Sequence, residues 1–139
     1  SISGETTSGG ANRIQKLLHQ HQPNIVVIEL GGNDGLRGSP ISLMKQNFDH
    51  MIVQSKRAGA KVFLLSMQIP PNYGLGYSKL FARQYQQLAA KHNIKLVPFF
   101  LADIVTKEGM MQDDGIHPTE KAQPFMLESV WEVLQHTVQ

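Results

Sequence analysis

Asp114 and His117 are the residues of this chain whose types and spacing most clearly suggest chemistry. A histidine acts as a general base when a neighbouring acceptor holds the proton of one ring nitrogen and leaves the other nitrogen free. Gly115 and Pro118 favour a turn that brings the carboxylate and the imidazole together. The pair therefore predicts two members of a Ser-His-Asp arrangement. The alternative is a surface histidine beside a helix-capping aspartate.

Two further positions could supply hydrogen-bond donors to the oxyanion that forms when an ester is attacked. Asn33 carries a side-chain amide within a glycine-rich segment, and Gly4 could offer its backbone N–H because no Cβ blocks a close approach. Each also fits a simpler interpretation. Asn33, Asp34 and Gly35 are residues favoured in tight turns, and Gly4 could be an ordinary loop glycine.

Composition excludes several classes of protein. The formal net charge of +2 is too small to indicate a nucleic-acid partner, and the longest apolar run, residues 25–28, is too short to cross a bilayer. The absence of cysteine excludes disulfides, thiolate catalysis and cysteine-ligated zinc. His19 and His21 stand two residues apart on an expected helix and point away from each other, so we predict no metal site and no cofactor.

Strand and helix patterns alternate along the chain. Residues 24–30, 61–67 and 94–98 are apolar runs typical of strands, and the first is rich in β-branched residues, as in a strand buried on both faces. A length of 139 residues predicts one domain, residues 1–139. The order of elements predicts an α/β fold with a parallel sheet and helices on both faces.

Four helices are expected from apolar residues with helical spacing. The first follows a cap at Ser8, the second lies between Pro40 and Gly59, the third starts near Tyr77 or Ser78, and the last spans residues 119–137. The apolar faces of the first three are formed by Ala11, Ile14, Leu17 and Leu18, then Met44, Phe48, Met51 and Ile52, then Leu80, Phe81, Tyr85 and Leu88. His50, His92 and His136 lie in no pattern that predicts a partner, and we expect them to be surface or boundary residues.

Glycine-rich and polar loops follow every predicted strand. In parallel sheets ligands bind beyond the carboxyl ends of the strands. Residues 31–35, 68–74 and the segment leading to Asp114 and His117 all fall at that edge, and so does Gly4. The sequence therefore predicts one site.

Gly4, Asn33 and the turn from Asp114 to His117 follow one another in the order, and in the sequence context, found in the SGNH (GDSL-type) hydrolases. The chain resembles in particular the bacterial arylesterases and multifunctional thioesterase/lysophospholipases of that family. The matching stretches are residues 1–4, 29–38, 69–74 and 111–118, and the resemblance covers essentially the whole chain. The resemblance implies a three-layer α/β/α flavodoxin-like parallel sheet. It also implies that Gly4 and Asn33 form the oxyanion hole and that Asp114 and His117 complete the triad.

One departure from the family concerns the nucleophile. The family's first block, Gly-Asp-Ser-Leu or similar, supplies the reactive serine after the first strand, and no such block occurs here. We therefore expect the chain to begin inside a longer sequence, with the first strand and the serine in a missing N-terminal segment. On that expectation this chain alone is nearly inactive and unstable, because the missing strand leaves backbone groups unpaired.

The predicted substrate is a small acyl ester, an acyl thioester or a lysophospholipid. Apolar residues on two loops could contact its acyl or aryl group, and the resemblance makes residues 35–39 a movable segment. These substrate-binding residues are Gly35, Leu36, Ile69, Pro70 and Tyr73. The alternative is that they close the top of the core.

Two other functions stay open from the sequence. One is a carbohydrate acetyl esterase, and the other is a non-catalytic acyl-binding remnant that kept the pocket and lost the nucleophile. The resemblance alone implies a periplasmic or secreted location.

Overall fold

The structure, a computed structural model, describes residues 5–97. These residues lie almost entirely within the first of the two units into which the chain divides, Ser1–Leu96. Predictions on Gly4, Asp114, His117, His136 and the helix at 119–137 lie outside the described residues. The prediction of a single domain therefore stays a prediction.

Strands and helices alternate in the described part as the sequence predicted. In chain order the elements are α1 Thr7–His21, β1 Ile25–Ile28, α2 Gly32–Leu36, α3 Ile41–Arg57, β2 Lys61–Leu65, the 3₁₀ turn η1 Pro71–Tyr73, α4 Leu75–His92 and β3 Lys95–Val97. The short helix α2 was not predicted, because its sequence reads equally well as a turn.

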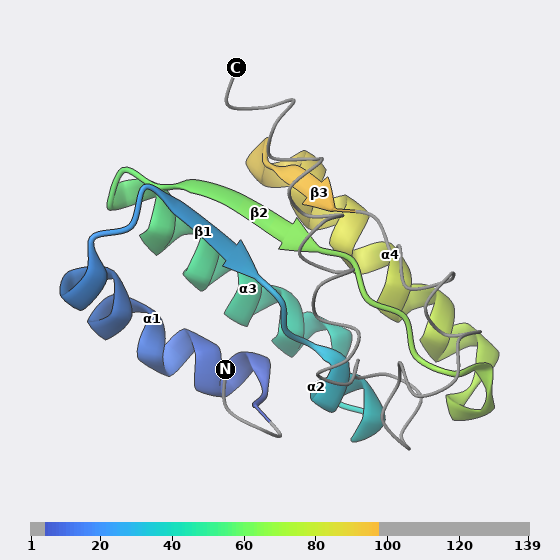
Figure 1. The fold of residues 1–139 in the computed structure, drawn as a ribbon. Coiled ribbons are helices and arrows are strands. Elements are labelled where there is room, and N and C mark those ends of the chain that lie inside the picture. The colour runs from blue at the N-terminus through green and yellow to red at the C-terminus, as the bar shows by residue number, and fades with distance from the viewer. Residues whose placement is uncertain (1–4, 98–139) are drawn as a thin grey trace, which may run out of the picture. The chain divides into compact units, whose positions relative to one another are not determined.

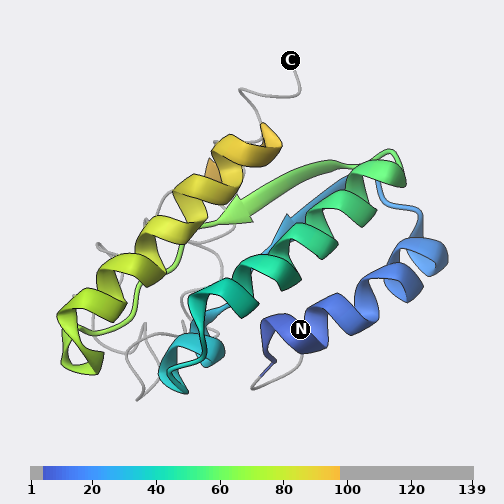
Figure 2. The same ribbon diagram turned by 180° about the vertical axis from the view of Figure 1, so that it is seen from behind.

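The sheet has the order β1-β2-β3 within the described residues. β1 and β2 run parallel, and their register places Ile25 opposite Lys61 and Ile28 opposite Leu64. Helix α3 crosses behind the strands in Figure 1 and in front of them in Figure 2, with α1 on one side of it and α4 on the other. The predicted α/β fold with a parallel sheet is confirmed.

The core lies between this helical layer and the strands. The predicted face of α3 is confirmed, because Met44, Phe48, Met51 and Ile52 are all buried. Strand β2 is buried from its second residue onward, and burial continues past its end to Met67 and Ile69. Apolar residues that continue beyond the last strand pairing explain why the predicted strands were too long.

The expected burial of β1 on both faces was wrong, and two residues of the apolar helix faces are exposed. Val27 is 41% exposed, Leu17 is 36% exposed and Leu80 is 53% exposed. Successive side chains of a strand point to opposite faces, so Val27 lies opposite the face on which Ile28 is buried. The described helices cover one face of the strands, and β1 is therefore not buried on both.

Two helix starts also differ from prediction. Helix α1 begins at Thr7 with Thr6 as its cap, since the Thr6 hydroxyl accepts a hydrogen bond from the Gly9 N–H at 3.3 Å, and Ser8 lies inside the helix. Helix α4 begins at Leu75, directly after η1, rather than at Tyr77 or Ser78. The second helix is confirmed between Pro40, its N-cap, and Gly59.

Candidate active site

Segments from two distant parts of the chain meet beyond the carboxyl end of β1. The loop after β1 runs directly into α2, and the first turn of α1 lies beside it (Figure 1). Hydrogen bonds join residues 5 and 7 to residues 33 and 34. Residues 5–7 therefore lie beside the loop of Asn33, and the position of Gly4 at this edge stays a prediction.

The loop after β1 packs on α4 through Gly31 and Tyr85. Gly31 has a φ of +107°, and a Cβ added there would lie 2.2 Å from the Tyr85 hydroxyl, so only glycine fits. The hydroxyl of Tyr85 donates to the Leu30 carbonyl at 2.8 Å. Its ring packs edge-on against Phe48 and Phe81, with centroids 5.5 and 5.6 Å away. The loop after β1 thus rests on an aromatic cluster.

The phenol of Tyr85 is held in its neutral, donating form. Burial raises its pKa well above the ordinary value, and the negative charge of Asp34 adds to that increase. A neutral phenol keeps its proton for the Leu30 carbonyl, which fixes the chain one residue before Gly31.

Asn33 is anchored through its side chain. Its Nδ2 donates to the carbonyl of Glu5 at 3.1 Å, in partly buried surroundings. This bond orients the amide and ties it to the residue that directly follows Gly4. An amide nitrogen carries two hydrogens, so such a group can be oriented by one acceptor and serve a second. The role of Asn33 as an oxyanion donor stays a prediction.

Asp34 is a buried carboxylate that the sequence analysis did not single out. It is 3% exposed and accepts two hydrogen bonds from Thr7, from the backbone N–H at 2.8 Å and from the hydroxyl at 2.7 Å. The Thr7 hydroxyl in turn accepts from the Asn47 amide of α3 at 3.1 Å. No sequence signal pointed to this pairing, because an aspartate followed by glycine is typical of an exposed turn.

The loops after β1 and β2 also meet. A Cβ on Gly35 would lie 2.8 Å from Ile69 and 2.7 Å from Phe81, so the backbone of α2 packs closely on both side chains. Ile69 is buried, whereas Tyr73 is 43% exposed. Leu36 and Pro70 are half-buried. Ile69 thus fits the alternative of closing the core, and substrate binding by these five residues stays a prediction.

Tyr77 links the segment of residues 35–39 to α4. Its hydroxyl donates to the Ser39 carbonyl at 2.6 Å, and burial, with a smaller effect from the charge of Asp34, raises its pKa. Ser78 likewise donates to the Pro70 carbonyl at 3.3 Å. The first turn of α4 therefore holds both loops that were predicted to contact the acyl group.

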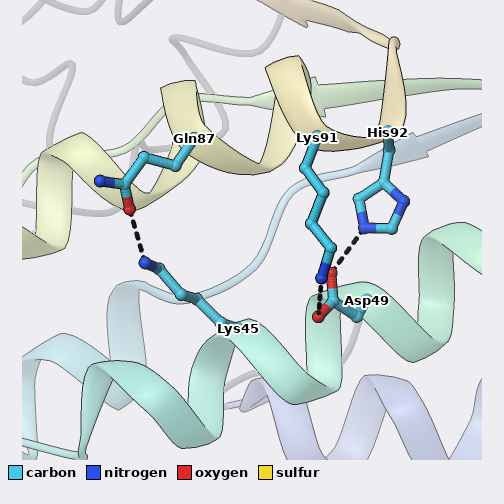
Figure 3. A network of polar contacts seen from close by, with 5 residues as sticks. All are labelled: Lys45, Asp49, Gln87, Lys91 and His92. Carbon is cyan, nitrogen blue, oxygen red and sulfur yellow. Dashed lines mark hydrogen bonds and ion pairs between the residues drawn. The ribbon is translucent and has the colours of Figure 1, made fainter.

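A second polar cluster joins α3 to α4 (Figure 3). Asp49 accepts from Lys91 at 3.0 Å and lies 2.5 Å from His92 Nε2, and Lys45 donates to Gln87 at 2.5 Å. His92 is half-buried, as expected for a boundary residue, and no sequence pattern predicted its partner Asp49, which lies on another helix 43 residues earlier. His50 is exposed, as expected for a surface residue.

Neither a metal site nor a membrane span was found where the structure describes the chain. No group of three or more histidine, cysteine, aspartate or glutamate side chains in residues 5–97 is placed to hold a metal ion. His19 and His21 are exposed in the last turn of α1. Within the same residues, no helix combines the length and hydropathy needed to span a bilayer.

Comparison with known proteins identifies the family. Residues 1–123 match the model of the GDSL-like lipase/acylhydrolase family. The chain is 50% identical over 135 residues to the esterase TesA of Pseudomonas aeruginosa, covering 97% of this chain and 67% of the relative. It is 46% identical over 137 residues to an arylesterase of Vibrio mimicus, covering 98% of this chain and 68% of the relative.

A solved structure agrees with the sequence matches. The psychrotrophic esterase EstA from Pseudoalteromonas sp., inhibited by monoethylphosphonate, superimposes with a TM-score of 0.91 at 41% identity, covering 99% of this chain and 75% of the other. The chain is likewise 42% identical to the thioesterase 1/protease 1/lysophospholipase L1 of Escherichia coli, of which it spans 66%. The fold, the family model and these identities together show that the chain belongs to the GDSL-like lipase/acylhydrolase family of carboxylic ester hydrolases.

Proposed function

We propose that the protein hydrolyses acyl esters and thioesters through an acyl-serine intermediate, with Asp114, His117, Gly4 and Asn33 as its catalytic residues. The observation that supports this best is the anchoring of the Asn33 amide to the Glu5 carbonyl beyond the end of β1. That contact joins the two segments from which the oxyanion donors are proposed to come. The names of the relatives, esterase, arylesterase and thioesterase/lysophospholipase, support the substrate class.

The proposed reaction proceeds in two halves. The serine hydroxyl attacks the acyl carbonyl while His117 removes its proton, and Asp114 holds the imidazole in the correct tautomer. Gly4 and Asn33 stabilise the negative oxygen of the tetrahedral intermediate. The intermediate collapses and the alcohol or thiol leaves with the proton from His117. Water, deprotonated by His117, then attacks the acyl-serine. Collapse of this second intermediate breaks the bond to the serine oxygen, which takes the proton back from His117, and releases the carboxylic acid.

The acyl group is proposed to lie against the loops that follow β1 and β2. Leu36, Pro70 and Tyr73 offer partly exposed apolar surface there, and Gly35 lets the backbone of α2 approach Ile69. A periplasmic or secreted location is part of the same proposal, based on the family resemblance alone.

The nucleophile is proposed to come from sequence ahead of Ser1. Labelling with a fluorophosphonate, followed by mass spectrometry of the modified peptide, tests this directly. We expect no adduct on residues 1–139 and a single adduct upstream when the protein includes that sequence. An adduct on any serine of residues 1–139 would show instead that this chain carries its own nucleophile.

The roles of the base and the oxyanion donor are tested by substitution in the complete protein. His117→Ala is expected to lower kcat for p-nitrophenyl butyrate by about three orders of magnitude or more, and Asn33→Ala by about two to three. His50→Ala is a matched control, because His50 is an exposed histidine on α3. Unchanged turnover in His117→Ala would contradict the proposed function.

A further inference from the structure

Asp34 is a buried carboxylate of the described residues to which the proposed chemistry gives no role. It lies in α2, directly after Asn33, and the residue is 3% exposed to solvent. Burying a carboxylate is unfavourable unless hydrogen bonds replace its water. An aspartate kept at such a position, one residue from the proposed oxyanion donor, needs a physical explanation.

The explanation begins with the donors that Asp34 binds. Both carboxylate oxygens are used, one by the Thr7 N–H and the other by the Thr7 hydroxyl. These donors belong to the first residue of α1, 27 positions away in the sequence. The carboxylate therefore fixes the loop after β1 to the start of α1 through two bonds that constrain distance and direction together.

The electrostatic setting strengthens this attachment. The N-terminus of a helix carries a partial positive charge from unpaired N–H groups, and negative groups stabilise it. Helix α1 has no acidic residue of its own in its first turn. Asp34 supplies that charge from another element, while Thr6 caps the Gly9 N–H.

A third element completes the junction. Asn47 of α3 donates from one amide nitrogen to the hydroxyls of Thr7 and Ser8, each at 3.1 Å. The Thr7 hydroxyl thus donates to Asp34 and accepts from Asn47, so its orientation is determined from both sides. Just beside this junction, the Asn33 amide donates to Glu5.

We propose that Asp34, acting through Thr7, is a positioning residue for Asn33 that holds its amide where the oxyanion forms. This inference rests on the proposed function of Asn33. The contacts with Thr7 leave α2 and the start of α1 little freedom to shift against each other, and the Asn33–Glu5 bond spans the same boundary. Small displacements of a catalytic donor reduce turnover strongly, since a misplacement of about 1 Å can lower the rate about a hundredfold.

The test is a double-mutant cycle in the complete protein, with kcat and KM measured for p-nitrophenyl butyrate. Asp34→Asn should lower kcat by about 10- to 100-fold with KM nearly unchanged, because the donor matters mainly in the transition state. In the Asn33→Ala background the same substitution should lower kcat less than about threefold, since no amide remains to be positioned. Equal effects in both backgrounds would mean that Asp34 is merely structural and would overturn the inference.

Thr7 offers a milder pair of variants if Asp34→Asn folds poorly. Thr7→Val keeps the shape and the backbone N–H but loses the hydroxyl, and should lower kcat about tenfold, whereas Thr7→Ser keeps the hydroxyl and should retain wild-type kcat. Asp49→Asn is the matched control, because it alters a carboxylate that joins α3 to α4 instead. All rates are measured at least ten degrees below each variant's Tm.

The two levels of the proposal fail in different ways. If Asn33→Ala leaves kcat unchanged, the oxyanion role of Asn33 is wrong and the inference about Asp34 falls with it. If Asn33→Ala lowers kcat by orders of magnitude while Asp34→Asn and Thr7→Val do not, the proposed function stands and only the positioning role is wrong.

Discussion

Asp34 and Asp49 both connect separate elements of the fold, but one is buried and the other is partly exposed. Each carboxylate joins two elements that are far apart in the sequence, and each receives donors on both oxygens. Asp34 is 3% exposed and its donors are the neutral N–H and hydroxyl of Thr7. The Asp49 side chain is 29% exposed, and its partners are Lys91 and His92 (Figure 3).

The difference shows that a buried hydrogen bond fixes the relative position of the two groups it joins more strongly than an exposed one. Water can replace the partners of an exposed carboxylate, so a surface ion pair contributes little to stability. Asp34 is only 3% exposed, so loss of its bonds would leave buried groups unpaired. The buried aspartate therefore fixes geometry near the proposed site, while the partly exposed one connects two helices that the apolar core already holds together.

The largest expected effect is that of Asp34→Ala on stability. Removal of the carboxylate leaves the buried Thr7 N–H without its acceptor and should lower the free energy of unfolding by about 3 kcal/mol. Urea denaturation of the wild type and the variant measures this change. A loss similar to that of Asp49→Ala would remove the contrast between the two aspartates.

A somewhat smaller effect is expected for Gly31→Ala. The new Cβ would meet the Tyr85 hydroxyl at a residue whose φ is +107°, so stability should fall by about 2 kcal/mol. The clash and the backbone strain can be separated. In a Tyr85→Phe background the clash is removed, and Gly31→Ala should then reduce stability by only about 1 kcal/mol. Equal losses in both backgrounds would show that the backbone angle alone is responsible.

Asp49→Ala should have a much smaller effect than Asp34→Ala. The loss of its contacts with Lys91 and His92 is expected to lower stability by less than about 1 kcal/mol, and salt should reduce the difference further. Thermal unfolding of both proteins at low and high ionic strength measures this. A loss of several kcal/mol that is insensitive to salt would show that Asp49 behaves like a buried group.

The smallest effect concerns pH. Burial acts to raise the pKa of Asp49, but the hydrogen bonds from His92 and Lys91 and their charges outweigh it, so the pKa lies below its ordinary value of 3.8. A lowered carboxylate pKa stabilises the fold above the ordinary value, and that contribution is lost as pH falls through the folded-state pKa. The stability difference between wild type and Asp49→Ala should therefore disappear as pH is lowered below 3.8. A difference that grew on acidification would reverse the sign expected for Asp49.

Local sequence patterns predicted where helices and strands lie better than they predicted which of their residues are buried. The spacing of Met44, Phe48, Met51 and Ile52 identified the buried face of α3, because a helix that packs on a sheet must bury one stripe. The same reasoning failed for Leu80 on α4 and for Val27 on β1. Burial of those residues depends on which elements lie against them, and spacing within one element does not contain that information.

The residues of the candidate site likewise fall into those that the sequence predicted and those that it missed. The residue types of Asn33, Asp114 and His117, with the resemblance of their flanking motifs, predicted the family that the comparisons show. Asp34, Thr7 and Tyr77 were missed, since an aspartate before a glycine, a threonine near a helix start and a tyrosine near another have ordinary local explanations. Their functional interest comes only from partners that lie 27 to 38 residues away.

The sequence by itself determined the alternation of strands and helices, the apolar faces that form most of the core and the motifs that place the chain in its family. Those features follow from local periodicity and from residue chemistry, which act over a few positions. Only the tertiary structure decided that Asp34 binds Thr7, that Tyr85 leaves room for nothing larger than Gly31, and that Asp49 meets His92. Such pairs form because packing removes water from particular side chains and leaves each buried polar group to find its partner within reach.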